Sequence, residues 1–398
     1  MSTRSSRSSW IWLLVLFSVA GAVESAFFGQ IASFTPLYLP QLGISSEQVD
    51  DWTAGIMAAA NVVGILFLPF WGALSDRYSR KPVIVRSFVA HLVAIGFMLV
   101  TGNIWMFVIG RTVMNLSLGN SGLMMTTLVE RAPAERLGLS FAILNGTSTV
   151  GVFLGPLFGG PILDRWSFEV LLLINGVLLL SLIGALIFGY RDNFKGTDNE
   201  PVMRMALDSL RILIGSRQLR FLFLSFLVLF CGWMLTRTYI SLVVMSLYKG
   251  PMPGSAIGNV AAAAGAAALI LGPLGGALSD RWGHGRVLFV GAVLQVLLWP
   301  LPALAWDIAS FTIAWVVLNA VVSAVFAVSF AVLSSAAPEK IRGRVMSFAY
   351  LPINLALIAG PLLAAPVVNH FGVMAVFPLS AVLTLMSVGL LARTRVQF

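Results

Sequence analysis

Long apolar runs separated by short polar loops recur along the whole chain. Each run is roughly 20 residues, long enough for a helix to cross a bilayer core of about 30 Å, whereas the strands of a membrane barrel are about ten residues of alternating character. The pattern therefore predicts an all-α membrane protein with twelve transmembrane helices. We place these helices at residues 10–38, 52–74, 83–101, 104–128, 138–162, 168–190, 219–247, 255–279, 286–305, 308–333, 343–368 and 372–392.

The composition agrees with this pattern. Of 398 residues, 58% are hydrophobic and only 10% are charged, against about 25% charged residues in a typical soluble domain. A net charge of +9 in a soluble protein would point to nucleic acid. Here the basic residues lie mostly in short loops, so we expect no nucleic-acid partner. Residues 10–38 are too long for the core of a signal peptide and are predicted to form the first span.

Lys and Arg residues fall mainly on one side of the predicted membrane. The N-terminal segment, the 72–82 loop and the polar stretch 191–220 share that side, whereas the loops of the other side hold only Arg165 and Lys249. The positive-inside rule then places both termini of a multi-pass cell (inner) membrane protein in the cytoplasm. We divide the chain into an N-terminal six-helix bundle at 1–190, a cytoplasmic linker at 191–218 and a C-terminal six-helix bundle at 219–398.

The two halves carry the same short motifs in the same order. The sequence GALSDR occurs at Gly72–Arg77 and again at Gly276–Arg281, about half the chain apart. Gly155-Pro156 and Gly360-Pro361 repeat at nearly the same spacing. An internal duplication with both ends of each half on one side predicts two parallel-related bundles around a central cavity, with the solute site near the bilayer midplane.

These residues resemble the major facilitator superfamily over the whole chain. The loop after the second predicted span is similar to the motif of that family, with Ser79 in place of its second glycine; the matching residues are Gly72, Leu74, Asp76, Arg77, Arg80 and Lys81. The fifth span is similar to the signature of the drug–proton antiporter branch and carries Gly151, Gly155, Pro156, Gly159 and Gly160. The resemblance implies a secondary transporter that exports hydrophobic or amphipathic small molecules in exchange for protons, by alternating access.

The loop motif suggests a gate at the cytoplasmic side. A carboxylate such as Asp76 can accept hydrogen bonds from the free N–H groups at the start of a neighbouring helix, and the resemblance implies a helix of the other half as its partner. Arg77 and Arg80 can pair with Glu130. We expect a gating set of Gly72, Asp76, Arg77, Arg80 and Glu130, with a weaker copy at Asp280 and Arg281. The alternative is that these charges only fix the topology.

Glycines at four-residue spacing suggest a close helix contact in each half. Small residues at this spacing let two backbones approach, and a proline within a helix can bend it. We expect a packing face or hinge formed by Gly151, Gly155, Pro156 and Gly159, with a counterpart at Gly360 and Pro361. This glycine face either packs statically against its neighbour or slides along it during transport, and the sequence does not choose between the two.

Three charged residues lie deep in apolar runs, namely Glu24, Arg111 and Arg237. An ionisable group inside a membrane is costly and marks a functional pathway by default. We expect Glu24 to load and release a proton, opposite Arg237; the alternative is a static ion pair between them. Arg111 either donates structural hydrogen bonds or serves the proton site. Gln30 and Asn115 could bind substrate or could bridge helices.

The sequence favours a transporter over an enzyme. Cys231 is the only cysteine, the three histidines lie far apart, and no phosphate-binding Gly-x-x-x-x-Gly-Lys loop occurs, so we expect no metal, no cofactor and no use of ATP. The expected partners are a small-molecule substrate, protons and the lipid bilayer, and the expected state is a monomer. The alternative functions are a proton-coupled uptake symporter and the flipping of a lipid-linked molecule.

Overall fold

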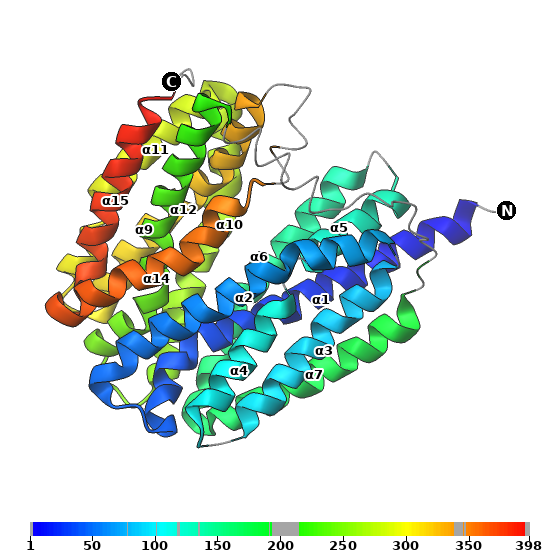
Figure 1. Cartoon of the computed structure of the whole chain (residues 1–398), viewed down its shortest axis with the longest axis horizontal. Helices are drawn as coiled ribbons and strands as arrows, with labels where there is room; N and C mark the ends of the chain where they lie inside the picture. Colours follow the sequence, from blue (N-terminus) through cyan, green and yellow to red (C-terminus); the bar gives the residue numbers. More distant parts are fainter. Residues whose placement is uncertain are drawn as a thin grey trace. The chain divides into compact units, whose positions relative to one another are not determined.

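The computed structural model describes residues 3–77, 79–100, 102–117, 120–133, 136–190, 192, 215–337, 345 and 348–394 (Figure 1). These residues are almost entirely helical, and they contain no strand. The predicted fold class, an all-α membrane protein, is confirmed.

Thirteen α-helices in the described part of the chain are named here with their bounds. They are α1 Thr3–Tyr38, α2 Val49–Arg77, α3 Arg80–Leu99, α4 Ile104–Met114, α5 Asn120–Arg131, α6 Leu137–Arg165, α7 Phe168–Gly189, α9 Arg217–Leu247, α10 Pro253–Trp282, α11 His284–Leu298, α12 Ile308–Ala336, α14 Leu351–Phe371 and α15 Val376–Leu391. Eleven helices among the described residues are long and apolar enough to cross a membrane. The one predicted span not among these eleven, 104–128, the fourth along the chain, is present as two shorter helices.

The fourth span is broken near its middle. The helices α4 and α5 have only 11 and 12 residues, and a 3₁₀ turn at Asn115–Ser117 follows α4 directly. The sequence around the break is rich in Asn, Ser and Gly, residues whose side chains compete for backbone hydrogen bonds or whose backbone is costly to order in a helix. The hydropathy of residues 104–128 predicts one continuous span and does not reveal this interruption.

The chain forms two compact units. The first contains Met1–Ile44 and Ala59–Val202, and the second contains Ser45–Ala58 and Met203–Phe398. The beginning of α2 therefore belongs to the second unit, where the Asn369 side-chain amide donates a 2.8 Å hydrogen bond to Asp51. Most of the expected linker, residues 193–214, lies outside the described residues.

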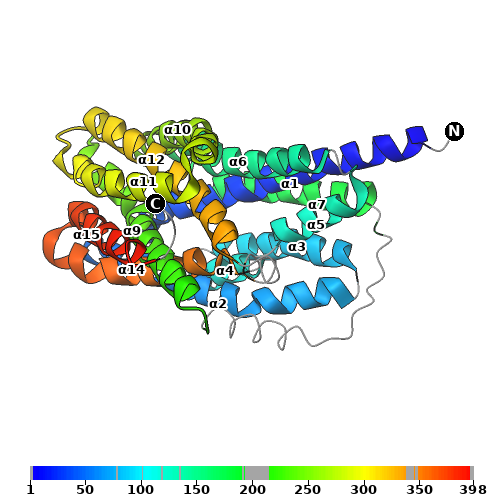
Figure 2. The ribbon, with the colours of Figure 1, turned by 90° about the horizontal axis from the view of Figure 1, so that it is seen from above.

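In the second unit, α15 packs against α9 and α11 (Figure 2), and hydroxyl groups join these helices. On α15, Ser380 donates to the carbonyl oxygen of Gly232 at 2.7 Å and Ser387 donates to that of Ser225 at 2.8 Å. Both acceptors lie on α9. The Trp299 indole N–H, at the end of α11, donates to Thr384 at 2.8 Å. Such bonds compensate buried polar groups and hold helices together where both surfaces are already apolar.

Candidate functional site

Glu24 lies near the middle of α1 and is partly buried. The Asn120 side-chain amide donates a 2.9 Å hydrogen bond to its Oε2 atom, and the Ser117 hydroxyl also donates to the carboxyl group. Ser117 ends the 3₁₀ turn, and Asn120 begins α5. The break in the fourth span therefore brings two hydrogen-bond donors to the acid that the sequence placed deep in the membrane.

The helix α3 brings two basic side chains to the same carboxyl group. His91 and Arg86 both interact electrostatically with Glu24. The His91 ring is buried, and its Nδ1 lies 2.8 Å from the Ser87 carbonyl oxygen. Because a carbonyl oxygen can only accept, Nδ1 carries the proton and donates this hydrogen bond.

Sequence reasoning missed Arg86 and His91 as members of this site. Arg86 lies only a few residues inside the predicted span 83–101, where a basic residue normally reaches back to the membrane surface. A signal was present, because both residues lie in an apolar run. Whether these two side chains face Glu24 depends on the rotation of α3 about its axis, which hydropathy does not specify.

Arg111 and Asn115 lie beside this group on α4. Arg111 is almost completely buried; its guanidinium lies over the Phe28 ring, 5.9 Å from the ring centroid, and Nη1 is 3.5 Å from the Met114 sulfur. Asn115 is buried at the C-terminal cap of α4. The cation–π contact connects Arg111 to α1, one helical turn from Glu24.

Gln30 lies in a different environment from Glu24. Its Nε2 donates to the Gly155 carbonyl oxygen at 2.9 Å, and its Oε1 accepts from Asn175 at 2.7 Å. Both amide groups are buried. These two hydrogen bonds join α1 to α6 and to α7, so the observed partners of Gln30 are groups on neighbouring helices. Its predicted role in substrate binding stays a prediction.

Arg237 lies on α9 in the second unit, and its side chain is exposed. The predicted ion pair with Glu24 joins residues of different units and stays a prediction. Within the second unit, α9 and α12 share a cluster of aromatic rings, to which Trp233, one helical turn before Arg237, belongs. Trp233 and Phe326 have ring centroids 5.3 Å apart, and Phe326 contacts Phe230 and Phe330 at 5.5 and 5.0 Å.

The expected gate is only partly described. The side chains of Gly72, Asp76, Arg77 and Glu130 lie outside the described residues, although α2 extends to Arg77. The start of α3 is capped by Asp192, whose Oδ2 accepts from the Ser79 hydroxyl at 2.7 Å and from the backbone N–H groups of Arg80 and Lys81 at 2.8 and 3.1 Å. A carboxylate does cap a helix at this loop, but it comes from the segment after α7.

The two copies of the loop motif have different backbones. Ser79 is extended, with φ −165° and ψ 146°, whereas its counterpart Gly283 has φ 93°. A positive φ of this kind favours glycine, while the extended Ser79 aims its hydroxyl at Asp192. In the second copy, Asp280 lies 3.9 Å from His284 Nδ1, and Arg281 is exposed.

The predicted glycine face of α6 packs closely against α1. A Cβ atom added at Gly151 would overlap the Ala22 carbonyl oxygen, and one at Gly155 would overlap that of Ala26. In the second unit, a Cβ at Gly360 on α14 would come within 2.8 Å of the Leu235 backbone nitrogen on α9. The first and fifth spans of each half therefore approach through glycine. A sliding or hinge role for this face, and for Pro156, Gly159 and Pro361, stays a prediction.

No group of three or more His, Cys, Asp or Glu side chains that could hold a metal ion occurs among the described residues. The carboxyl group of Glu24 has amide, hydroxyl, imidazole and guanidinium groups as its neighbours.

Comparisons with known proteins identify relatives along the whole chain. The multidrug resistance protein MdtG of Klebsiella pneumoniae is 26% identical over 393 residues, which cover 96% of this chain and 93% of that protein. The protein of the same name from Enterobacter lignolyticus is 27% identical over 393 residues, covering 95% and 90%.

Solved structures share the fold at low sequence identity. The nucleoside transporter NupG has a TM-score of 0.79 at 14% identity, covering 96% of this chain and 98% of that one. A bacterial homologue of the human lysosomal transporter Spinster has a TM-score of 0.78 at 13% identity, covering 98% and 97%. The family model of the Major Facilitator Superfamily matches residues 13–252 and 222–397, and this match shows that the chain belongs to the Major Facilitator Superfamily, a family of membrane transporters and not of enzymes.

Proposed function

We propose that this protein exports hydrophobic or amphipathic small molecules in exchange for protons, by alternating access, and that Glu24 carries the proton. The observation that carries the proposal is the set of contacts around one carboxyl group in the first span: Asn120 donates to it at 2.9 Å, and His91 and Arg86 interact with its charge. The names of the relatives, multidrug resistance proteins, support export as the direction.

The contacts suggest how a proton could change the structure. With Glu24 ionised, its charge is offset by Arg86, and the hydrogen bond from Asn120 is charge-assisted, hence stronger than a neutral one. When a proton binds, the charge disappears and these contacts weaken together. Because they join α1 to α3 and α5, the proton load biases the packing of α1, which is what coupling to a conformational equilibrium requires.

The substrate class follows from the aromatic side chains. Rings of Phe230, Trp233, Phe326 and Phe330 form a partly buried cluster in the second unit. Aromatic faces suit flat, apolar or cationic molecules. Such a surface has few directional hydrogen bonds, so it accepts many related compounds, as an exporter of varied molecules requires.

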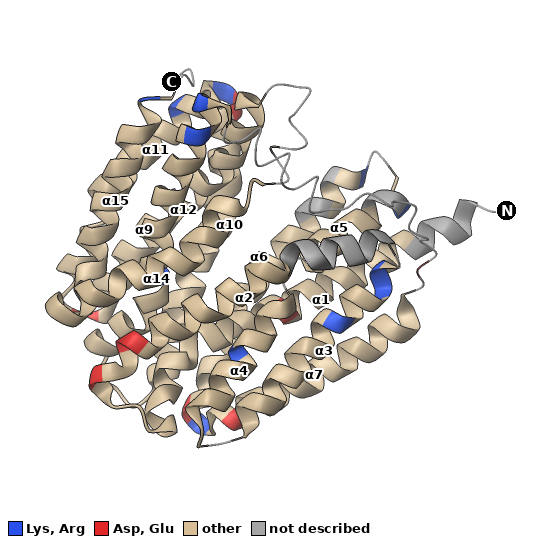
Figure 3. Ribbon diagram, in the orientation of Figure 1, with Lys and Arg blue, Asp and Glu red and all other residues tan. Residues whose placement is uncertain are grey.

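The proposal also includes the orientation of the protein in the membrane and its oligomeric state. Most basic residues of the second unit lie at the end of its helices where the chain ends (Figure 3), and the positive-inside rule places that end in the cytoplasm. Both termini of the protein are then cytoplasmic, in the cell (inner) membrane. The protein works as a monomer.

The test is proton-driven flux in liposomes that contain the purified protein, with a panel of cationic and neutral fluorescent dyes. Glu24→Gln keeps the size of the side chain but cannot release a proton, so we expect loss of uphill transport with downhill exchange retained. Glu47→Gln, at an exposed position in the short turn Ser46–Gln48, is the matched control and keeps uphill transport. Wild-type uphill flux in Glu24→Gln would refute the proton role.

A second variant separates coupling from structure. If Glu24 only neutralises Arg237, the double change Glu24→Gln with Arg237→Gln restores both thermal stability and uphill flux. Under the proposal, the double variant stays uncoupled whatever its stability.

A further inference from the structure

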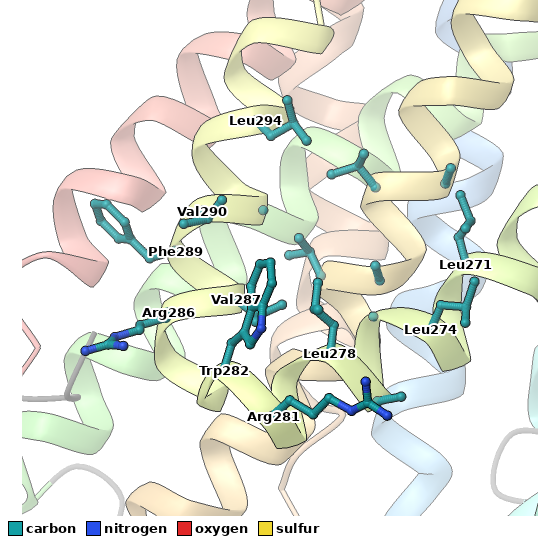
Figure 4. Close-up of a pocket in the computed structure, with 17 residues that line it drawn as sticks. Leu271, Leu274, Leu278, Arg281, Trp282, Arg286, Val287, Phe289, Val290 and Leu294 are labelled. Atoms are coloured by element: carbon teal, nitrogen blue, oxygen red, sulfur yellow. The ribbon is translucent and has the colours of Figure 1, made fainter.

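A cavity of about 890 Å³ lies between α10, α11 and α12 in the second unit. Its walls are almost entirely apolar, with Leu271, Leu274 and Leu278 on α10 and Val290 and Leu294 on α11 (Figure 4). Several of these side chains are largely exposed, Leu274 by 56% and Val290 by 64%. An exposed apolar groove between membrane-spanning helices is suited to bind a hydrocarbon chain, such as the acyl chain of a lipid.

The groove has the length of one bilayer leaflet. From Leu271 to Trp282 the axis of α10 rises about 16 Å, at ~1.5 Å per residue. Half of a hydrocarbon core of about 30 Å is about 15 Å. One end of the groove therefore lies near the membrane surface and the other near the midplane, as the path of an acyl chain requires.

The end near the surface is positively charged. Arg281 and Arg286 line this end on opposite sides of Trp282, with their guanidinium groups pointing away from each other, and the leucine and valine side chains extend away from this end (Figure 4). Both arginines are exposed, and no hydrogen bond or ion pair joins either guanidinium to another described residue. Trp282, 65% exposed, has the indole that is enriched at membrane–water interfaces.

The acid next to Arg281 in the sequence, Asp280, has its contact with His284. Asp280 is three-quarters exposed, and its carboxylate lies beside His284 at 3.9 Å. Guanidinium groups bind phosphate oxygens with paired hydrogen bonds. Two of them at the mouth of an apolar groove are complementary to a molecule with a negative head and an aliphatic tail, and they repel a cationic amphiphile.

We propose that the groove between α10, α11 and α12 binds one anionic phospholipid, with an acyl chain along Leu274, Leu278 and Val290 and the headgroup at the positively charged end that Arg281 and Arg286 flank. The lipid belongs to the leaflet at which α10 ends. The site is separate from Glu24, and the inference does not depend on the substrate or on the direction of transport.

The test uses the full-length protein, purified in detergent with an equimolar mixture of dioleoyl phosphatidylglycerol and dioleoyl phosphatidylcholine, and native mass spectrometry of the retained lipid. We expect one phosphatidylglycerol to be retained selectively. The double variant Arg281→Gln with Arg286→Gln should lower the ratio of phosphatidylglycerol to phosphatidylcholine by about tenfold, as expected for the loss of two basic side chains near an anionic headgroup.

The matched control removes the same charge elsewhere. Arg220 and Arg393 are exposed on the same side of the second unit, near the start of α9 and after the end of α15, and neither lines the groove. Arg220→Gln with Arg393→Gln should leave the lipid ratio unchanged. An equal fall in both double variants would mean general attraction to the membrane surface and would overturn the site.

A second variant tests the hydrocarbon part. Ala277 lines the groove and is exposed, so Ala277→Phe fills it while both arginines stay in place. We expect loss of the selective phosphatidylglycerol. Retention at the wild-type ratio would show that the acyl chain lies elsewhere.

Fluorescence gives a measurement that does not depend on these variants. Phosphatidylglycerol with brominated acyl chains should quench Trp282, seen as the difference between the wild type and Trp282→Phe in vesicles of neutral lipid. Absence of that difference, or its appearance with a dye of the transport panel and not with the anionic lipid, would contradict the proposal.

Discussion

The side-chain amide of Asn120 donates a hydrogen bond of 2.9 Å to the carboxyl group of Glu24. Asn120 is the first residue of α5, so the broken fourth span presents a donor to the acid of the first span. The same break brings Ser117 to the carboxyl group. A continuous helix through residues 104–128 would direct these side chains differently.

We expect Asn120→Ala to change the pH dependence of transport. Loss of the donor destabilises the ionised carboxyl relative to the protonated one. Half-maximal proton-driven flux should therefore move to higher pH. The measurement is flux in liposomes across a pH series. Asn145→Ala, at an exposed position on α6, should leave the profile in place, and an unshifted profile in Asn120→Ala would count against Glu24 as the coupling group.

The α1–α6 contact should tolerate no side chain at Gly155. A Cβ there overlaps the Ala26 backbone, so Gly155→Ala should lower the free energy of unfolding by about 1–3 kcal/mol, the range for overpacking. Gly146→Ala on the same helix is the control, because nothing lies within 4 Å of an added Cβ at that position. Thermal unfolding of the two variants in detergent checks this, and equal melting temperatures would contradict the close packing.

The buried amides of Gln30 and Asn175 should be energetically coupled. Their 2.7 Å hydrogen bond joins α1 to α7, and a polar bond between membrane helices is worth about 0.6–1.7 kcal/mol in double-mutant cycles. The cycle uses Gln30→Leu, Asn175→Leu and the double variant, with unfolding free energy as the measurement. Strict additivity of the two single changes would show that the bond contributes nothing.

Asp192 should stabilise the start of α3. Its carboxylate accepts two backbone N–H groups and the Ser79 hydroxyl, and loss of a helix cap costs about 0.5–2 kcal/mol. We expect Asp192→Ala to speed hydrogen exchange at the amides of Arg80 and Lys81, with no change at the amides of the first turn of α12. Ser79→Ala removes one donor and leaves the cap, so it should have the smaller effect.

The cap of α12 should depend on pH. Hydrogen bonds from the Ser310 side chain and backbone hold the pKa of the exposed Asp307 carboxyl below its ordinary value. A carboxyl group with a depressed folded-state pKa stabilises the folded state above the ordinary value, about 3.9, and loses this stabilisation as pH falls through the folded-state pKa. Hydrogen-exchange protection in the first turn of α12 should fall below about pH 4 in the wild type. Asp307→Asn keeps a capping side chain without a titrating group, so its protection should not vary with pH in this range.

The length and order of apolar runs determine much of this fold. Runs near 20 residues predict the spans, because only a helix satisfies every backbone group within hydrocarbon, and the repeated Gly72–Arg77 motif predicts two related halves. The glycine spacing at Gly151 and Gly155 likewise predicts a close helix contact, because absence of a Cβ is a property of the residue itself.

The tertiary structure decides the contacts that depend on helix rotation and on long-range approach. Hydropathy identifies Glu24 as a deep acid, but its neighbours Asn120, His91 and Arg86 come from two other helices whose facing sides the sequence does not specify. Gln30 is a polar residue in an apolar run, as a residue lining a solute cavity would be, yet its partners are a backbone carbonyl on α6 and Asn175 on α7. The reason is physical: the free energy of crossing a membrane depends on the summed polarity of a segment, whereas a hydrogen bond depends on distances of about 3 Å between atoms far apart in the chain.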